Sequence, residues 1–363
     1  MRSKWMVGVC LLAVLCHLAI GPAADGAVRN GGGGAASEQY YKSIKTKGVG
    51  NEGQGADISV ITSLDTDPRP DMVLMAYDNP EGSNTFRYKI MWNLNRYCVA
   101  DKMDENYVEV GGVGWEGQGA GIAISNLDTD PRPDMVLMAY DNPQQDNTFR
   151  YKVGWNLNSN GIADRWDNNF VEVGGVGWEG QGAGIAITSL DTDNRPDMVL
   201  MAYDNPAEDN TFRYKVGWNL NSNGIADRWD NNFVEVGGVG HEGQGAGIAI
   251  SNLDTDPRPD LVLMAYDNPE ESNTFRYKVG WNLNSNGIAD RWDNNFVEVG
   301  GVGHEGQGAG IAISNLDTDP RPDLVLMAYD PEPGAYLGIN SFRYKVAYNL
   351  NSNGVAQRLM GET

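Results

Sequence analysis

The sequence predicts an all-β protein assembled from five copies of one structural unit. Three observations support this prediction. Short apolar segments alternate with turn formers, and no segment carries a helical apolar period over ten residues. The two chain ends hold complementary parts of one unit. The pattern Gly-Val-Gly-x-Glu-Gly-Gln-Gly recurs at intervals of 64 and then 63 residues, with x at Asn51, Trp115, Trp178, His241 and His304.

The first 38 residues are expected to precede the repeated fold. Residues 1–23 combine a basic start, an apolar run over 6–20 and small residues suited to cleavage, which is the pattern of a secretory signal peptide. The apolar run is too short to span a bilayer comfortably. Residues 24–38 contain four consecutive glycines and are expected to form a flexible leader. The chain is therefore predicted to be secreted, without transmembrane anchoring.

Each unit is expected to contain four antiparallel strands. In the second unit these are residues 121–125, 134–140, 149–156 and 170–173. Four strands in about 63 residues match one blade of a β-propeller. Residues 39–363 are accordingly predicted to form a five-bladed β-propeller, with repeats at about 48–111, 112–174, 175–237, 238–300 and 301–363.

The chain ends predict a closed ring. The last unit stops at Thr363, before the place of its fourth strand, while residues 39–47 precede the first unit. Aligned on the other repeats, Ile44 falls at the position of Val171. We therefore expect the N-terminal strand to complete the last blade, because an open array would leave two exposed edges.

Composition limits the partners. The formal net charge of −22 argues against nucleic acid and anionic membranes, which require basic surfaces. Cys98 is the only cysteine after the predicted signal peptide, so no disulfide framework is expected. Cys98 is interpreted as a tolerated substitution, with a thiol linking two chains as the alternative.

An acidic turn precedes the second strand of every unit. Oxygen-bearing side chains at positions 1, 3, 5 and 9 of a short loop are the donors that a hard cation such as Ca²⁺ requires. The candidate metal ligands are Ser63, Asp65, Asp67 and Asp71; Asn126, Asp128, Asp130 and Asp134; Ser189, Asp191, Asp193 and Asp197; Asn252, Asp254, Asp256 and Asp260; and Asn315, Asp317, Asp319 and Asp323.

The segment Asn-Leu-Asp-Thr-Asp-Pro-Arg-Pro-Asp-Leu-Val-Leu resembles the calcium loop and following strand of FG-GAP and VCBS type repeats. The resemblance covers residues 48–363 and implies an integrin-like β-propeller with calcium as a cofactor. At position 6, however, the family has Gly, whereas this chain has Pro68, Pro131, Pro257 and Pro320, with Asn194 in the third unit. Since proline cannot adopt positive φ, a metal-free turn whose aspartates bond backbone N–H groups is the alternative.

Two further patterns were weighed for binding. The segment Asn156, Asn158, Asn160, Gly161 and Asp164 has similar ligand spacing, but Asn-Gly between strands favours a tight hairpin turn. The aromatic residues at one position of the third strand favour packing between blades, with sugar stacking as the alternative. They are Trp92, Trp155, Trp218, Trp281 and Tyr348.

The glycine loops are the candidate ligand-binding sites. An aromatic or His side chain beside Glu and Gln suits carbohydrate binding, although it equally suits hydrogen bonding within the loop. The candidate residues are Trp115, Glu116, Gln118, Trp178, Glu179, Gln181, His241, Glu242, Gln244, His304, Glu305 and Gln307.

The sequence therefore predicts a non-catalytic protein that recognises glycans or cell-surface proteins at several equivalent sites. Nucleophile-elbow and phosphate-loop motifs are absent from the sequence. Near-identical units favour repeated binding over one asymmetric active site. A carbohydrate-active enzyme on a propeller scaffold and a structural matrix or adhesion component are the alternatives.

Overall fold

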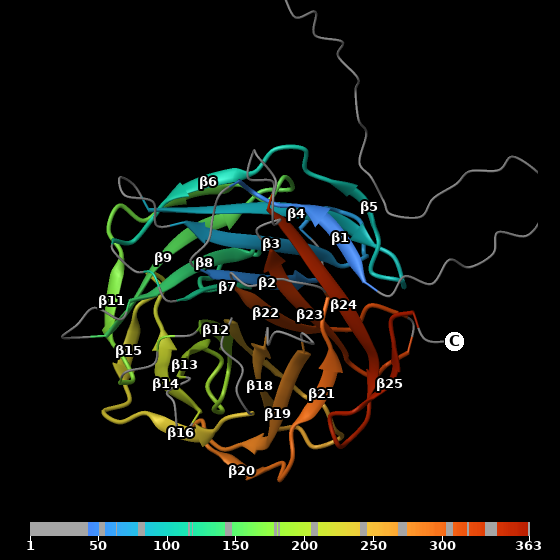
Figure 1. Ribbon diagram of the computed structural model, residues 1–363. Coiled ribbons are helices and arrows are strands. Elements are labelled where there is room, and N and C mark those ends of the chain that lie inside the picture. Colours follow the sequence, from blue (N-terminus) through green and yellow to red (C-terminus); the bar gives the residue numbers. More distant parts are fainter. Residues whose placement is uncertain are drawn as a thin grey trace, which may run out of the picture. The chain divides into compact units, whose positions relative to one another are not determined.

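The described residues form five antiparallel sheets around one axis (Figure 1). The computed structural model describes residues 43–50, 55–62, 64–78, 84–114, 117, 119–141, 147–177, 180, 182–204, 210–239, 245–267, 274–302, 308–317, 319–330 and 340–361. All of them belong to the compact unit Gln39–Thr363. The predicted signal peptide and leader lie outside the described residues. The fold is a five-bladed β-propeller of four-stranded antiparallel blades, as predicted.

The strands of every blade follow one order from the axis outward. The innermost strands are β2 (Gly55–Ile61), β7 (Gly119–Ser125), β12 (Gly182–Thr188), β17 (Gly245–Ser251) and β22 (Ala309–Ser314). The second strands are β3 (Asp71–Asp78), β8 (Asp134–Asp141), β13 (Asp197–Asp204), β18 (Asp260–Asp267) and β23 (Asp323–Asp330). The third strands are β4 (Thr85–Leu94), β9 (Thr148–Leu157), β14 (Thr211–Leu220), β19 (Thr274–Leu283) and β24 (Ser341–Leu350).

The outer strand of each blade is divided into two short pieces, and only the second was expected from the sequence. Both pieces pair with the same third strand, one with each half of it. The first pieces are β5 (Ala100–Met103), β10 (Ala163–Trp166), β15 (Ala226–Trp229), β20 (Ala289–Trp292) and β25 (Ala356–Leu359). The second pieces are β6 (Val108–Gly111), β11 (Val171–Gly174), β16 (Val234–Gly237), β21 (Val297–Gly300) and β1 (Ile44–Lys47).

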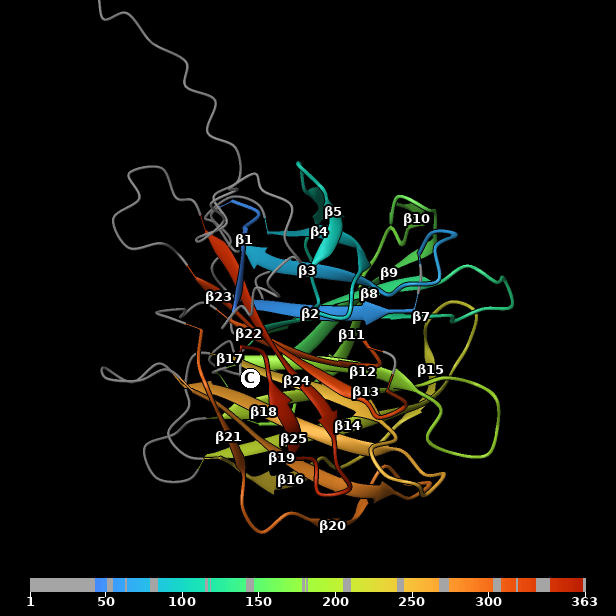
Figure 2. The same cartoon turned by 90° about the vertical axis from the view of Figure 1, so that its right-hand side faces the viewer.

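The N-terminal strand closes the ring, as predicted. β1 pairs antiparallel with β24, with Ile44 opposite Tyr344, just as Val171 lies opposite Tyr151 in the second blade. β1 and β24 lie side by side in both views (Figures 1 and 2). The C-terminal end supplies the other piece of this outer strand, β25, which pairs with the second half of β24 and was not expected from the sequence. The last blade thus shares its outer strand between both chain ends.

The hydrophobic core lies between neighbouring blades. Val153 and Trp155 of the second blade belong to one buried cluster with Ile185 and Leu200 of the third. The cluster between the first and last blades closes the series. Each interface is also fastened by a buried tyrosine hydroxyl of one blade, which donates at 2.8–3.0 Å to a hairpin-turn carbonyl of the next. The donors are Tyr88, Tyr151, Tyr214, Tyr277 and Tyr344, the last of which reaches back to Cys98 of the first blade.

Five glycines allow the innermost strands to meet at the axis. A Cβ added to any of them would come closer than 3.0 Å to the backbone nitrogen of an alanine in the adjacent blade. Backbone atoms cannot move aside as a flexible side chain can, so these positions require glycine. We call this set the axial glycine ring: Gly55, Gly119, Gly182, Gly245 and Gly308. Because Gly308 of the last blade contacts Ala56 of the first, the ring is continuous.

At Asp57 the innermost strand of the first blade departs from the five-fold pattern. The other four blades have glycine at this position: Gly121, Gly184, Gly247 and Gly310. The Asp57 side chain is buried, and its Oδ2 accepts the N–H of Ile122 in the next blade at 3.0 Å. Burial raises the pKa of this carboxyl well above its usual value, against the opposing effect of the backbone N–H groups.

Within the described ranges, no helix has the length and apolar character needed to cross a membrane.

The axial glycine ring yields a stability prediction. We expect Gly182→Ala to lower the free energy of unfolding by about 2 kcal/mol or more, because the added methyl group overpacks a backbone contact. Gly174→Ala is the matched control, since a Cβ at Gly174 meets no atom within 4 Å. Urea unfolding of both variants makes the comparison. If Gly182→Ala lowers the free energy of unfolding as little as Gly174→Ala does, the axis tolerates a side chain at this position.

Candidate functional site

A buried carboxylate at the start of each second strand holds the acidic turn in place. Asp134 is fully buried, and its Oδ2 accepts the N–H of Leu127 at 2.8 Å. Its Oδ1 accepts the N–H of Asn156, which lies in the third strand, also at 2.8 Å. We call this arrangement the aspartate clamp. It recurs with both bonds at 2.7–2.8 Å at Asp71, Asp197, Asp260 and Asp323.

The aspartate clamp holds a kink in the third strand. Asn156 has a φ of 57°, in the left-handed region that asparagine tolerates better than most residues. Before the kink, Trp155 packs towards the third blade, whereas after it Leu157 packs towards the first blade. One carboxylate therefore directs side chains of the same strand into two different interblade cores. Asn93, Asn219, Asn282 and Asn349 have the same conformation.

Burial raises the pKa of every clamp carboxyl above its ordinary value. The desolvation effect outweighs the two N–H bonds, and the neighbouring carboxylates of the turn act in the same upward direction at Asp71, Asp134, Asp197 and Asp260. The pKa of Asp323 is raised by the same principal cause.

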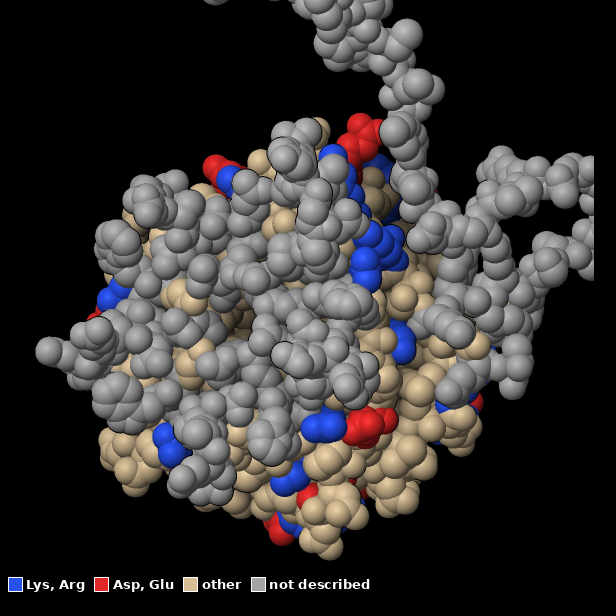
Figure 3. Space-filling model, viewed as in Figure 1, with Lys and Arg blue, Asp and Glu red and all other residues tan. Residues whose placement is uncertain are grey.

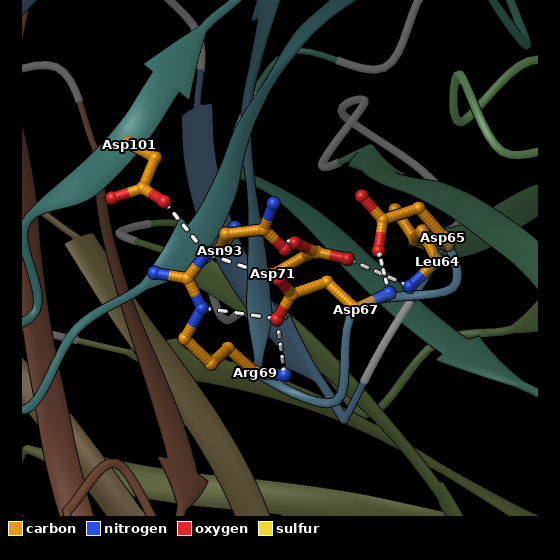
Figure 4. A network of polar contacts seen from close by, with 7 residues as sticks. All are labelled: Leu64, Asp65, Asp67, Arg69, Asp71, Asn93 and Asp101. Atoms are coloured by element: carbon orange, nitrogen blue, oxygen red, sulfur yellow. Dashed lines mark hydrogen bonds and ion pairs between the residues drawn. The ribbon is translucent and has the colours of Figure 1, made fainter.

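The outer aspartates of the turn bond backbone N–H groups and arginine. In the first turn, Asp65 Oδ1 accepts the N–H of Asp67 at 2.7 Å (Figure 4). Asp67 Oδ1 accepts both the backbone N–H and the Nε–H of Arg69 at 3.0 Å. The Arg69 guanidinium also reaches Asp101 of the outer strand at 2.6 Å. The hydrogen bond from Arg69 lowers the pKa of Asp67.

The arginine-to-outer-strand pair recurs in the next three blades and is replaced in the fifth. Arg132, Arg195 and Arg258 pair with Asp164, Asp227 and Asp290 at 2.5–2.8 Å. The fifth blade has Gln357 at the position of these outer-strand aspartates. There Arg321 instead makes two bonds to Asp319, at 2.7 and 2.8 Å, and lowers the pKa of Asp319 to about 2.

Proline at position 6 does not determine the turn geometry. The third turn has Asn194 there, yet Asp191 still accepts the N–H of Asp193, and Asp193 that of Arg195, both at 2.9 Å. The hydrogen bonds between aspartates and backbone therefore specify the turn, and proline is compatible with it.

The side chains of the acidic turn make hydrogen bonds that would compete with a calcium ion. Within the described part of the chain, no three Asp, Glu, His or Cys side chains converge as a metal-binding group. At position 1, the Asn126 side-chain amide points its N–H towards the Asp130 carbonyl, and at position 5 an arginine guanidinium bonds the carboxylate. Ser63 lies outside the described residues. The hydrogen bonds of the metal-free turn are thus present, and unfolding experiments with calcium can test whether an ion binds there as well.

The second candidate metal loop is a hairpin turn. Asn158 accepts the N–H of Gly161 at its carbonyl, 2.8 Å away, and donates its own N–H to Ile162 at 3.0 Å. Gly161 has a φ of 67°, and Cys98 takes the same left-handed conformation in the first blade. Asp164 pairs with Arg132 of the acidic turn. The Cys98 thiol is fully buried, so the alternative of a thiol linking two folded chains is wrong.

The strand tryptophans are core residues. Trp155 is 1% exposed, its indole N–H donates to Asp167 at 2.8 Å, and the Arg165 guanidinium covers its ring at 4.7 Å. Trp218 and Trp281 have the same surroundings. Sugar rings cannot reach these faces, so the packing interpretation is confirmed and the stacking alternative is wrong.

All twelve candidate ligand-binding residues of the glycine loops lie outside the described residues, but the segments on both sides of each loop are described. Gly112 donates its N–H to Asn84 at 2.7 Å, and Val113 is fully buried. The Gly114 carbonyl accepts the Tyr77 hydroxyl at 3.2 Å. On the other side, Gly119 belongs to the axial glycine ring. Each loop therefore begins at a fixed point beside the outer strand and ends at the axis.

Sequence reasoning did not anticipate the hydrogen bonds from tyrosine hydroxyls to the hairpin turns of neighbouring blades, the axial glycine ring or the contact of the aspartate clamp with the third strand. The repeated Gly-Ala-Gly-Ile at the innermost strand was an available signal for the ring. The other two features join residues far apart in the sequence. No motif in the chain indicated them.

Comparisons with known proteins add no family assignment: no protein-family model matches the chain, and no curated protein gives a significant match. The resemblance to FG-GAP and VCBS repeats therefore rests on the acidic-turn motif.

The aspartate clamp yields a stability prediction. We expect Asp197→Ala to cost about 3 kcal/mol of unfolding free energy, because two buried N–H groups lose their acceptor. The exposed Asp193 is the control within the same turn, and Asp193→Ala should cost less than about 1 kcal/mol. Chemical denaturation measures both. A cost at Asp193 as large as that at Asp197 would contradict the clamp assignment.

The raised clamp pKa values predict a pH dependence. A carboxyl with a higher pKa in the folded state binds protons more tightly when folded, so its contribution to stability falls as pH rises through the folded pKa. Wild type should therefore gain stability relative to Asp197→Asn as the pH falls from neutrality towards about 4, the unfolded value. Denaturation at several pH values tests this. The opposite trend would show that the two N–H bonds outweigh burial.

Thermal unfolding with calcium and with a chelator tests the acidic turns. An ion bound only to the folded state would add about 2.7 kcal/mol per site at a free concentration one hundred times its Kd. Because the turn carboxylates already accept protein hydrogen bonds, we expect no rise in Tm with calcium. A clear calcium-dependent rise would restore the metal interpretation.

Proposed function

We propose that this protein is a secreted, non-catalytic binding protein that recognises extracellular glycans or cell-surface proteins at several equivalent positions. The signal-peptide pattern of residues 1–23 supports export. The proposed contacts are the aromatic or His, Glu and Gln side chains of the glycine loops.

The axial glycine ring is the observation that carries this proposal. Gly119 and its four equivalents directly follow the loop residues in the sequence. At the axis, each of these glycines packs against the backbone of an alanine in the adjacent blade. The ends of all five loops are therefore gathered around one axis of a rigid ring. Such an arrangement suits multivalent recognition, in which individually weak contacts combine into a higher overall affinity.

The acidic turns lie on the opposite face from the glycine loops, and their contacts favour a structural role for that face. Figure 2 shows the innermost strands running away from one face of the ring towards the other, where the acidic turns follow them. Their aspartates are engaged with backbone N–H groups and arginines, so they serve the fold. In the face view, acidic and basic side chains of the described residues occur together around the periphery (Figure 3).

A glycan array probed with the mature protein tests this function. We expect binding that falls at least about tenfold in apparent affinity when Trp115→Ala and Trp178→Ala are combined, because two of the repeated contacts are lost. Phe170→Ala with Phe233→Ala is the matched control, since these aromatics are exposed on the outer strands at 39% and 40%.

Other outcomes would redirect the assignment. Release of reducing sugar from array glycans would identify an enzyme and contradict the non-catalytic proposal. Retention on cell surfaces that free sugar does not reverse would favour protein adhesion over glycan recognition. An equal loss of binding in the phenylalanine control would move the site to the outer strands.

A further inference from the structure

The Asp57 carboxyl lies where three innermost strands meet. It belongs to β2 and is 3% exposed, and its Oδ2 accepts the N–H of Ile122 in β7. Its Oδ1 lies against Gly310 of β22, since a Cβ added to that glycine would come closer than 3.0 Å to this oxygen. One side chain thus contacts the first, second and last blades.

The two oxygens of this carboxyl have different surroundings. Oδ2 has its hydrogen bond, whereas Oδ1 is buried and has no hydrogen-bond partner in the described part of the chain. The N–H groups of Ile58 and Ile311 lie close enough to lower the pKa of Asp57, although burial, the larger effect, raises it. Neither N–H is aligned for a hydrogen bond to Oδ1. An ionised carboxylate with an unbonded oxygen in a protein interior is costly.

Backbone carbonyls line the axial edge of the innermost strands. Ile122 lies opposite Leu137 of β8, yet its N–H bonds Asp57 instead of that strand. In an antiparallel pair, a residue whose N–H points away from the partner strand also points its C=O away from it. The same register recurs, each time opposite a leucine of the second strand, at Ile58, Ile185, Ile248 and Ile311. Hydrogen-bond acceptors therefore lie around the axis at the level of Asp57.

The strands packed around Asp57 supply no positive charge. β7, β12, β17 and β22 have no titratable side chain. In β3 and β23, which also pack against β2, the titratable residues lie at or next to the strand ends and are all acids or tyrosines: Asp71, Tyr77, Asp78, Asp323, Tyr329 and Asp330. A buried carboxyl without a counter-charge favours its neutral, protonated form.

We propose that Asp57 forms a pH-sensitive junction at the ring axis: as a neutral carboxylic acid it joins the innermost strands of the first, second and last blades, and release of its proton to solvent weakens this junction. In the acid form, Oδ2 accepts the Ile122 N–H and the Oδ1 hydroxyl donates to a carbonyl on the axial edge. In the carboxylate form Oδ1 has no proton to donate and faces oxygens of like partial charge. The other four blades have glycine here, so this property depends on one residue.

Chemical denaturation of wild type and Asp57→Asn from about pH 5 to about pH 8 tests this proposal. Asparagine has the shape of the neutral acid and can make both hydrogen bonds, but it does not titrate. A carboxyl with a raised folded pKa stabilises fully below its unfolded pKa, about 4, and this contribution is lost as pH rises through the folded pKa. The folding constant of wild type relative to Asp57→Asn should therefore fall at least about tenfold over this range, equivalent to about 1.4 kcal/mol.

Asp57→Gly is the matched control, because it copies the residue of the other four blades. Its stability relative to Asp57→Asn should not change with pH, since neither residue titrates. Asp57→Asn should be the more stable of the two, because it keeps the bond to Ile122. If Asp57→Asn does not fold, wild type and Asp57→Gly give the same pH comparison. An infrared difference spectrum of wild type minus Asp57→Gly at neutral pH should also show the carbonyl band of a protonated acid.

Four results would overturn the proposal. The first is a stability difference between wild type and Asp57→Asn that stays constant with pH, and the second is one that shifts in favour of wild type as pH rises. The third is equal stability of the Asn and Gly variants, which would show that the side chain does not join the blades. The fourth is a rise in wild-type Tm with a particular cation that Asp57→Asn lacks, which would place a metal ion on Oδ1 instead of a proton.

Discussion

The structure of every blade depends on one buried carboxylate, represented by Asp134. It accepts one N–H from the turn that follows the innermost strand and another from the kink in the third strand. By holding these two segments together, it sets where the third strand turns its side chains from one interblade core to the other. Because an ionisable group without hydrogen bonds is costly in a protein interior, the turn and the kink must form together with the carboxylate in place. Five copies of this constraint produce five blades of the same shape.

Blades of the same shape form a ring only if their interfaces close. Glycines at the axis let the innermost strands approach, tyrosine hydroxyls reach the hairpin turns of neighbouring blades, and the interblade clusters fill the space between. The last interface has the same kind of hydrogen bond, from the Tyr344 hydroxyl to the Cys98 carbonyl. The outer strand of that blade is different, since it comes from both chain ends and sets Lys45 opposite Arg343. Symmetry is thus strongest in the core and weakest at this outer pairing.

The acidic turn illustrates how one pattern supports two physical interpretations. Alternating aspartates can surround a cation, or they can accept successive backbone N–H groups. In this protein the N–H bonds are made, and arginines within the turns engage the carboxylates at position 5, as Arg69 does with Asp67. The repeated polar and aromatic residues of the glycine loops lie outside the described residues, and the proposed recognition is assigned to them.

The sequence by itself determined the repeat, the strand character, the five-blade count and the closure by Ile44, because these depend on periodicity and on alignment within the chain. It also indicated the hairpin at Gly161 and the packing of Trp155, since residue type and spacing restrict both. Only the tertiary structure decided that Asp134 bonds the third strand, that the outer strand is broken and that glycines form a ring. These features join residues separated by 20 or more positions or by whole blades, and local patterns carry no information on such distances.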